Sequence, residues 1–309
     1  MIYTLTMNPA IDLFCQTTHL IPKIVNRTNN DDVQANGKGV NVSFILKKLG
    51  IENKAMGFSA GFTGNYIEES LQEQKIETDF VTLKSGVTRI NVFVKDEEAA
   101  TEYKIVNSGP EVSPEAQKEL LEKIKMISKG DFLVVSGSLP QGCEPSILIE
   151  IAKICQNNQV KLVVDTSYHE VLDLLPYQPF LLKPNDEELE LWFDTEIAST
   201  TELVKYGEKL IDMGAQNILL SLGEEGALYL NQTTKLLGNA PVGEVVNTAC
   251  AGDTMLGTFL AYLMKEATFE VALQEAIAAG SSTAFREGLT DFSDTDELKK
   301  QIEIKNWRE

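Results

Sequence analysis

Short β-prone runs alternate with helical patterns along most of this chain, and the alternation limits its fold more than any other feature. Each apolar, β-branched run is followed by a turn and then by a stretch with helical spacing. This order is typical of an α/β fold, in which helices cover both faces of a mostly parallel central sheet. The expected strands of that sheet are residues 2–7, 54–58, 132–136, 161–165, 180–182 and 217–221.

The C-terminal third predicts a hairpin followed by helices. At 309 residues the chain is long enough for one large core, and we expect a single domain over residues 1–309. The expected hairpin strands are residues 227–230 and 234–237, and the expected helices are residues 253–265, 269–286 and 294–302.

Two segments, residues 12–35 and 87–106, interrupt the alternation. They carry β-prone alternating runs without a helix between them. We expect them to pair with each other in a small separate sheet, which would serve as a lid over a site or as an oligomerisation surface. The alternative is that they extend an edge of the main sheet.

Composition excludes several classes of partner. The chain has 27 Lys and Arg against 46 Asp and Glu, a net charge of −19, which repels nucleic acid and anionic membranes. Its first residues lack a basic leader pattern and no apolar run approaches the roughly 18 residues of a membrane span, so we expect a cytoplasmic protein. The four scattered cysteines are expected to be reduced. Because the chain has only two histidines, we do not expect a Ser-His or Cys-His nucleophile.

Residues 249–254 (Ala-Cys-Ala-Gly-Asp-Thr) run directly into an apolar helical pattern. The start of a helix offers unpaired N–H groups and partial positive charge, which suit the charge on a migrating phosphoryl group. Asp253 would then take the proton of an acceptor hydroxyl. Alternatively, Asp253 simply caps the helix, since Asp is a preferred N-cap.

A second glycine-rich segment, residues 36–43, also opens a helical pattern. It matches neither a Walker A loop nor a dinucleotide-binding fingerprint. Its glycines allow close approach of a polar ligand, for which Lys38 and Asn41 offer donors. Residues 136–140 (Ser-Gly-Ser-Leu-Pro) end an apolar strand, where ligands gather in open α/β sheets.

In order along the chain, six fragments resemble the ribokinase-like sugar kinases, also called the phosphofructokinase B family. The resemblance implies a ribokinase-like three-layer fold with a small β-sheet lid. Residues 61–64 and 88–91 are most similar to the 1-phosphofructokinase branch. The six fragments are residues 6–12, 36–41, 136–140, 183–188, 221–226 and 251–253.

The resemblance also implies roles for individual residues. Asp253 matches the catalytic base, and Cys250, Ala251 and Gly252 match the anion hole. Arg89 and Ser138 match positions that hold the phosphate already on the substrate, and Arg27 is a further candidate, although a solvated charge is an equal alternative for it. Matches to the sugar contacts are Asp12, Gly37, Lys38, Gly39 and Asn41.

For the nucleotide, the resemblance implies ATP and Mg²⁺, with Glu188 positioning the metal indirectly through water. Residues that match the ATP site are Lys183, Asn185, Glu188, Ser221, Gly223, Thr248 and Gly280. Two departures stand out: Cys250 replaces the usual first glycine of the anion hole, and Asn36 replaces the first glycine of the sugar signature. A reactive role for the Cys250 thiol is disfavoured, because the chemistry needs none.

We therefore expect an ATP-dependent kinase that converts fructose 1-phosphate to fructose 1,6-bisphosphate, acting as a homodimer through the lid. Tagatose-6-phosphate kinase is the alternative, because a ketofuranose has a hydroxymethyl carbon at each end. A sugar-phosphate sensor that lost turnover through the change at Cys250 is the alternative from another class.

Overall fold

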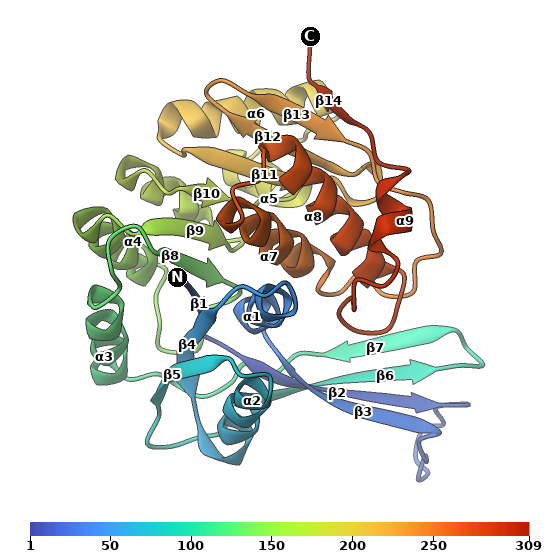
Figure 1. The fold of residues 1–309 in the computed structure, drawn as a ribbon. Helices are drawn as coiled ribbons and strands as arrows, with labels where there is room; N and C mark the ends of the chain where they lie inside the picture. The colour runs from blue at the N-terminus through green and yellow to red at the C-terminus, as the bar shows by residue number, and fades with distance from the viewer. Residues whose placement is uncertain (309) are drawn as a thin grey trace.

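A computed structural model describes residues 1–308 of the chain (Figure 1). The strands in this range are β1 (Ile2–Thr6), β2 (Ala10–Thr17), β3 (Asn30–Asn36), β4 (Asn53–Ser59), β5 (Glu77–Thr82), β6 (Arg89–Asp96), β7 (Thr101–Ile105), β8 (Phe132–Ser136), β9 (Lys161–Asp165), β10 (Leu181–Leu182), β11 (Asn217–Ser221), β12 (Ala227–Asn231), β13 (Lys235–Gly238) and β14 (Ile304–Asn306).

The helices lie between these strands and after them. They are α1 (Lys38–Lys48), α2 (Gly61–Glu73), α3 (Pro114–Lys125), α4 (Ser146–Asn158), α5 (Asp186–Phe193), α6 (Thr200–Met213), α7 (Ala251–Met264), α8 (Phe269–Ala284) and α9 (Thr295–Lys299), with 3₁₀ turns at His169–Tyr177 and Gly223–Glu225. No helix in the described part of the chain is both long and apolar enough to cross a bilayer.

The main sheet has ten strands in the order β14-β13-β12-β11-β10-β9-β8-β1-β4-β5. The seven strands from β11 to β5 are parallel, and β12, β13 and β14 continue the sheet as antiparallel neighbours. This arrangement confirms the expected α/β fold with a mostly parallel sheet and the expected hairpin. Edge strands β5 and β14 were not expected from the sequence.

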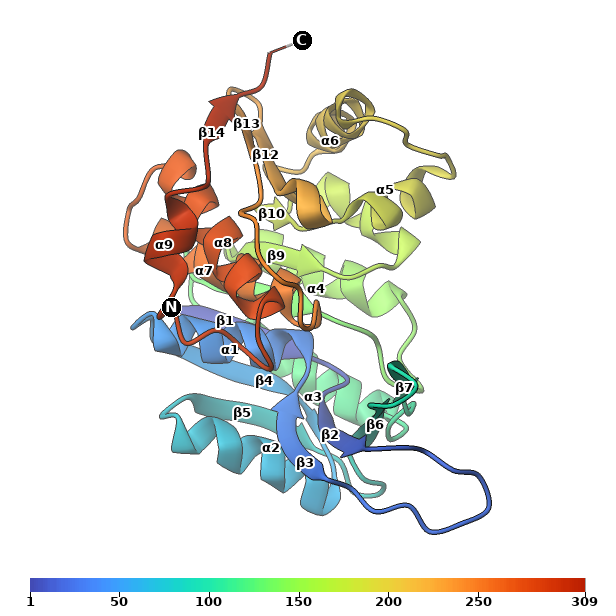
Figure 2. The same ribbon diagram turned by 90° about the vertical axis from the view of Figure 1, so that its right-hand side faces the viewer.

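Helices cover both faces of this sheet (Figure 2). Because successive side chains of a strand point to opposite faces, β8 sends Phe132 and Val134 toward helices α1, α7 and α8, and Leu133 and Val135 toward α3 to α6. Strands buried on both sides read as continuous apolar runs, which explains why the central strands were easy to predict.

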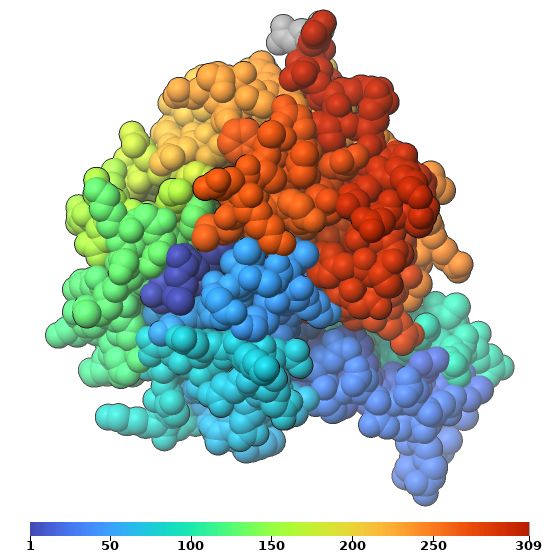
Figure 3. Space-filling view, in the orientation of Figure 1, coloured from blue at the N-terminus to red at the C-terminus, as the bar shows by residue number. Residues whose placement is uncertain are grey.

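Residues 12–35 and 87–106 form the separate sheet that the sequence predicted, with the order β3-β2-β6-β7. It protrudes from one side of the body (Figure 3). Cross-strand partners place Val33, Leu13, Val92 and Ile105 in one row across all four strands. One face of this second sheet therefore carries an apolar row, and the other carries polar residues that include Asp12.

The helix boundaries differ slightly from the prediction. Helix α7 begins at Ala251, two residues earlier than expected, and α9 is shorter than residues 294–302. Helix α1 begins at Lys38, so residues 38–43 of the glycine-rich segment form the first turns of the helix, whereas Asn36 ends β3 and Gly37 is the N-cap.

Candidate active site

Polar residues gather where the parallel strands end and helices α1 and α7 begin. Strands β1, β8, β9 and β10 end at this edge, and Ser136, Asp165 and Lys183 lie at or directly after their last residues. The carboxyl ends of parallel strands in an open α/β sheet meet at one crevice, which is where such folds bind ligands.

The start of α7 forms a tight turn that presents the first N–H groups of the helix. Cys250 is the N-cap, in a left-handed conformation with φ 64° and ψ −1°. Such a conformation costs a non-glycine residue roughly 1–2 kcal/mol. Because Cys250 nevertheless adopts it, this loop accommodates a side chain where the family pattern has glycine. Asp253 is the third residue of the helix and is buried. The alternative that Asp253 is the N-cap is therefore wrong.

One buried carboxylate holds two lysines beside this helix start. Lys38 Nζ and Lys183 Nζ each lie 3.1 Å from Asp165 Oδ1, and Asp165 is fully buried. Burial would raise the pKa of Asp165, but the two ammonium groups outweigh it and hold that pKa below its usual value. A Cβ atom added to Gly252 would lie 3.4 Å from Lys183 Nζ, so this ammonium faces the start of α7.

Asp165 was not among the predicted site residues. Its second oxygen, Oδ2, is buried without a hydrogen-bond partner. The signal was present in the sequence, because a lone acidic residue at the end of a central apolar strand is seldom there for packing. Its partners Lys38 and Lys183 come from two other elements, and the sequence does not show that they meet.

The same charges determine the proton affinity of Asp253. Burial and the neighbouring Asp165 carboxylate raise the pKa of Asp253 to about 6, against the opposing effect of Lys38, Asn41 and Lys183. A carboxylate with a pKa near the working pH is suited to accept a proton from a hydroxyl. By contrast, burial raises the pKa of the Cys250 thiol to about 12, which argues against a thiolate nucleophile.

A chain of neutral amides runs from the second sheet to Asp253. Asp12 Oδ1 accepts a hydrogen bond from Asn91 Nδ2 (2.8 Å), and Asp12 Oδ2 accepts one from Asn36 Nδ2 (2.6 Å). Asn41 Nδ2 donates to Asn36 Oδ1 and to Asp253 Oδ2, each at 2.8 Å. Burial raises the pKa of Asp12 above its usual value, although Asn91, Arg89 and Asn36 oppose this.

Arg89 and Ser138, which match the phosphate positions of the family pattern, lie close to each other. Arg89 Nη2 donates to the Asn8 carbonyl at 2.8 Å and lies 3.5 Å from Ser138 Oγ, and Nη1 donates to the Asn107 carbonyl at 3.2 Å. Arg89 Nε is buried without an acceptor. A guanidinium held by neutral carbonyls keeps its charge available for an anion.

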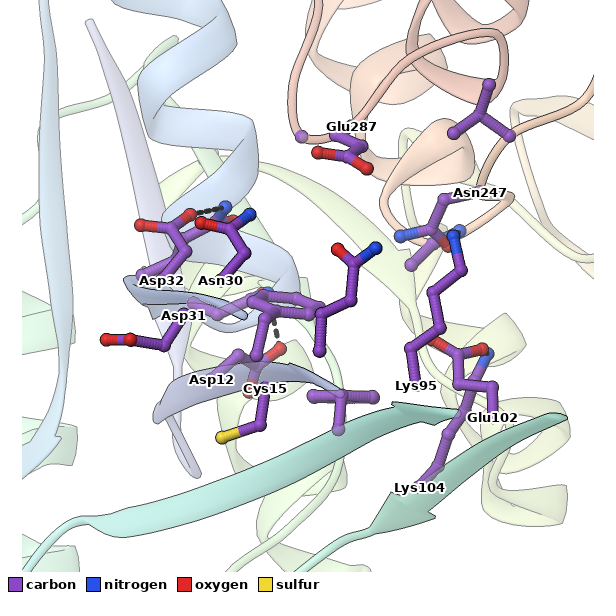
Figure 4. Close-up of a pocket in the computed structure, with 18 of the residues that line it drawn as sticks. Asp12, Cys15, Asn30, Asp31, Asp32, Lys95, Glu102, Lys104, Asn247 and Glu287 are labelled. Carbon is purple, nitrogen blue, oxygen red and sulfur yellow. Dashed lines mark hydrogen bonds and ion pairs between the residues drawn. The ribbon is translucent and has the colours of Figure 1, made fainter. Parts of the chain in front are cut away.

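A pocket separates the polar face of the second sheet from the body (Figure 4). Asp12 and Asn36 lie on its wall, and Asn247 and Glu287 reach it from the body loops. Asp253 does not line this pocket itself. It accepts a hydrogen bond from Asn41, whose amide nitrogen also contacts the sulfur of Cys250, a residue that lines the pocket. Arg27 is not among the lining residues either, because it lies exposed in the loop between β2 and β3.

The predicted glycines of the sugar signature lie against strand β1. Gly37 is the N-cap of α1 with φ +132°, and a Cβ atom there would lie 2.8 Å from Thr6 Cγ2. At Gly39 a Cβ atom would lie 2.5 Å from Thr6 Oγ1. Both positions therefore need glycine for close packing of the helix on the strand.

The predicted nucleotide residues lie at the start of α5, at the end of β11, in the 3₁₀ turn after it and around the start of α7. Asn185 is the N-cap of α5 and forms a capping box with Glu188, whose Oε2 accepts the Asn185 N–H at 3.1 Å. Ser221 ends β11 beside Asn185, and Gly223 begins a 3₁₀ turn. Around α7 itself, the Thr248 carbonyl accepts the Ala251 N–H, and a Cβ atom at Gly280 would lie 3.2 Å from the Ala251 carbonyl.

Comparisons with known proteins show what the whole chain is similar to. The family model described as pfkB family carbohydrate kinase matches residues 3–296. A D-tagatose-1-phosphate kinase from Bacillus licheniformis is 47% identical, over 98% of this chain and 99% of that protein. A 1-phosphofructokinase from Bacillus subtilis is 36% identical over 98% and 99%. The crystal structure of phosphofructokinase-2 from Escherichia coli with substrates and products has a TM-score of 0.90 at 27% identity, over 97% and 98%.

Proposed function

Because this chain belongs to the pfkB family of carbohydrate kinases, we propose that it transfers a phosphoryl group from ATP to carbon 6 of a ketohexose 1-phosphate. Fructose 1-phosphate and tagatose 1-phosphate, which differ only in configuration at carbon 4, are the two candidate substrates. A substrate with its phosphate at carbon 1 is supported by the names of two relatives, D-tagatose-1-phosphate kinase and 1-phosphofructokinase. Tagatose 6-phosphate is the alternative substrate.

The observation that carries the proposal is the position of Asp253 between two sets of partners. On one side Lys183 and the amides at the start of α7 form a cationic cradle for an anion. On the other side Asn41 and Asn36 connect Asp253 to Asp12, which faces the pocket. A hydroxyl bound by Asp12 and a terminal phosphate bound at the amides would converge on the Asp253 carboxylate.

In the proposed reaction, Asp253 accepts the proton of the sugar hydroxyl as its oxygen forms a bond to the γ-phosphorus. The bond between that phosphorus and the bridging oxygen breaks, and ADP leaves with the electron pair. Lys183 and the amides around Gly252 stabilise the charge on the transferred group. Arg89 and Ser138 hold the phosphate already on the sugar.

The residues fit a magnesium ion carried by the nucleotide more closely than one held by the protein. Within residues 1–308 no group of three or more His, Cys, Asp and Glu side chains could hold a metal ion. One oxygen of Glu188 is used in its capping box, so we propose that Glu188 acts on the metal through water. When bound, Mg²⁺ neutralises charge on the ATP phosphates.

ADP release tests the proposal with four substrates: fructose 1-phosphate, tagatose 1-phosphate, tagatose 6-phosphate and fructose 6-phosphate, each with Mg²⁺ and ATP. We expect the two 1-phosphates to give the highest kcat/KM values. A preference for a 6-phosphate would reverse the proposed orientation of the sugar. Saturable binding of a sugar phosphate without ADP release would favour the sensor alternative.

The second sheet supports a homodimer as the active form. Its outward face carries Val33, Tyr103 and Ile105, which are 43%, 47% and 55% exposed. Apolar patches of this kind mark interaction surfaces, and we propose that two copies of the chain bury them against each other. We also propose a cytoplasmic enzyme, since ATP and sugar phosphates are cytoplasmic metabolites.

A further inference from the structure

Asn36 occupies a central place between the two carboxylates of the site. Its Nδ2 donates to Asp12 Oδ2 at 2.6 Å, and its Oδ1 accepts from Gly37 N at 2.5 Å and from Asn41 Nδ2 at 2.8 Å. We propose that Asn36 is a positioning residue that couples the sugar-binding carboxylate of Asp12 to the base, Asp253, through Asn41. This inference rests on the proposed function.

The direction of the hydrogen bonds explains why an amide is needed at this position. The carboxylate of Asp12 only accepts, so it requires a donor, whereas the Asn41 amide that holds Asp253 requires an acceptor. A carboxamide supplies both from one planar group. An aspartate would place a second acceptor against Asp12, and glycine would supply neither group.

The two departures from the glycine pattern also meet in space. Asn36 and Cys250 are 214 residues apart, and Asn36 Nδ2 lies 3.9 Å from Cys250 Sγ. Asn41 Nδ2 lies 3.1 Å from the same sulfur. The Cys250 side chain therefore closes the space beside both amides, and the two larger residues form one contact in place of two glycines.

The coupling has a measurable consequence for Asp253. The ionisable groups that face this carboxylate are Lys38 from α1, Lys183 after β10, Asp165 from β9 and Cys250 from the preceding turn. Asn41 adds a hydrogen bond that favours the ionised form. When Asn36 no longer holds Asn41, that bond is populated less and the pKa of Asp253 rises.

The test compares Asn36→Leu, which keeps the number of side-chain heavy atoms and removes every side-chain hydrogen bond, with Asn306→Leu on exposed strand β14 as the matched control. The pKa of Asp253 in the ligand-free protein is followed by carboxyl-carbon NMR, assigned with Asp253→Asn. We expect Asn36→Leu to raise this pKa by roughly half to one unit. The KM for the sugar phosphate should rise about fivefold, the effect of one hydrogen bond, with the KM for ATP within about twofold.

A pKa of Asp253 and a sugar-phosphate KM equal to those of the control would overturn the proposal. Should Asn36→Leu fail to fold, Asn36→Gly replaces it, and an unchanged KM for the sugar phosphate is then the contradicting result. The NMR titration needs no turnover. A shifted pKa in a protein that phosphorylates no ketohexose phosphate would sink the proposed function while the positioning role stands.

Discussion

The body and the second sheet hold their polar groups in different ways. In the body, Asp165 and Lys183 are buried full charges that neutralise each other at 3.1 Å. In the second sheet, Asp12 is held by the neutral amides of Asn36 and Asn91. Lys104 of this sheet is exposed and pairs with Glu102. Buried paired charges are fixed before a ligand arrives. Neutral amides orient a carboxylate and leave it free to accept hydroxyls.

For the proposed reaction, this difference leads us to propose that the body stabilises the charge that develops on the phosphoryl group and that the second sheet recognises the sugar. Variants of the body should therefore lower kcat, whereas variants at the second sheet should raise the KM for the sugar phosphate. A variant at the second sheet that lowered kcat as far as a body variant would break this comparison.

The largest effect is expected for Asp253→Asn, which keeps the shape of the side chain but removes the proton acceptor. We expect kcat to fall by at least ~10²-fold, measured as ADP release with saturating ATP and sugar phosphate. Binding of the sugar phosphate, measured by calorimetry, should be retained and confirms that the variant is folded. Turnover near that of the parent protein would remove Asp253 from the role of base.

Much of the fold was predictable, because central strands and the two interrupting segments differ clearly in pattern. The site was predictable only as separate fragments. That Lys38 and Asp165 meet across 127 residues follows from the order of strands in the sheet, which no local pattern records. The left-handed turn at Cys250 was also hidden, because only tertiary packing keeps a cysteine there.

The next effect in size is expected for Arg89→Ala at the start of the second sheet. A lost charge-assisted contact to the sugar phosphate should raise its KM roughly 10- to 100-fold, with kcat changed much less. Arg27→Ala provides the comparison, since that arginine is exposed in the loop between β2 and β3. We expect a smaller rise for it, and an unchanged KM for Arg89→Ala would exclude Arg89 from the phosphate site.

A third prediction concerns the outer face of the second sheet. Ile105→Glu places a charge in the apolar row, so we expect the proposed dimer to dissociate, observed by sedimentation velocity at micromolar concentration. Met126→Glu is the control, because Met126 is 81% exposed at the end of α3, away from this sheet. A parent protein that sediments as a monomer would contradict the proposed dimer.

The smallest effect is expected in the stability of the ligand-free protein. The pKa of Asp253 is raised in the folded state, from 3.8 to about 6, so the folded protein holds this proton more tightly than the unfolded chain. Stability is therefore lost as the pH rises from about 4 to about 6, and the loss remains in full above that range.

Asp253→Asn carries no such penalty. Its melting temperature should exceed that of the parent protein by a few degrees at pH 8, and the difference should shrink toward pH 4. A difference that is constant with pH would show that the body does not hold Asp253 under electrostatic strain, and the contrast with the second sheet would lose its physical basis.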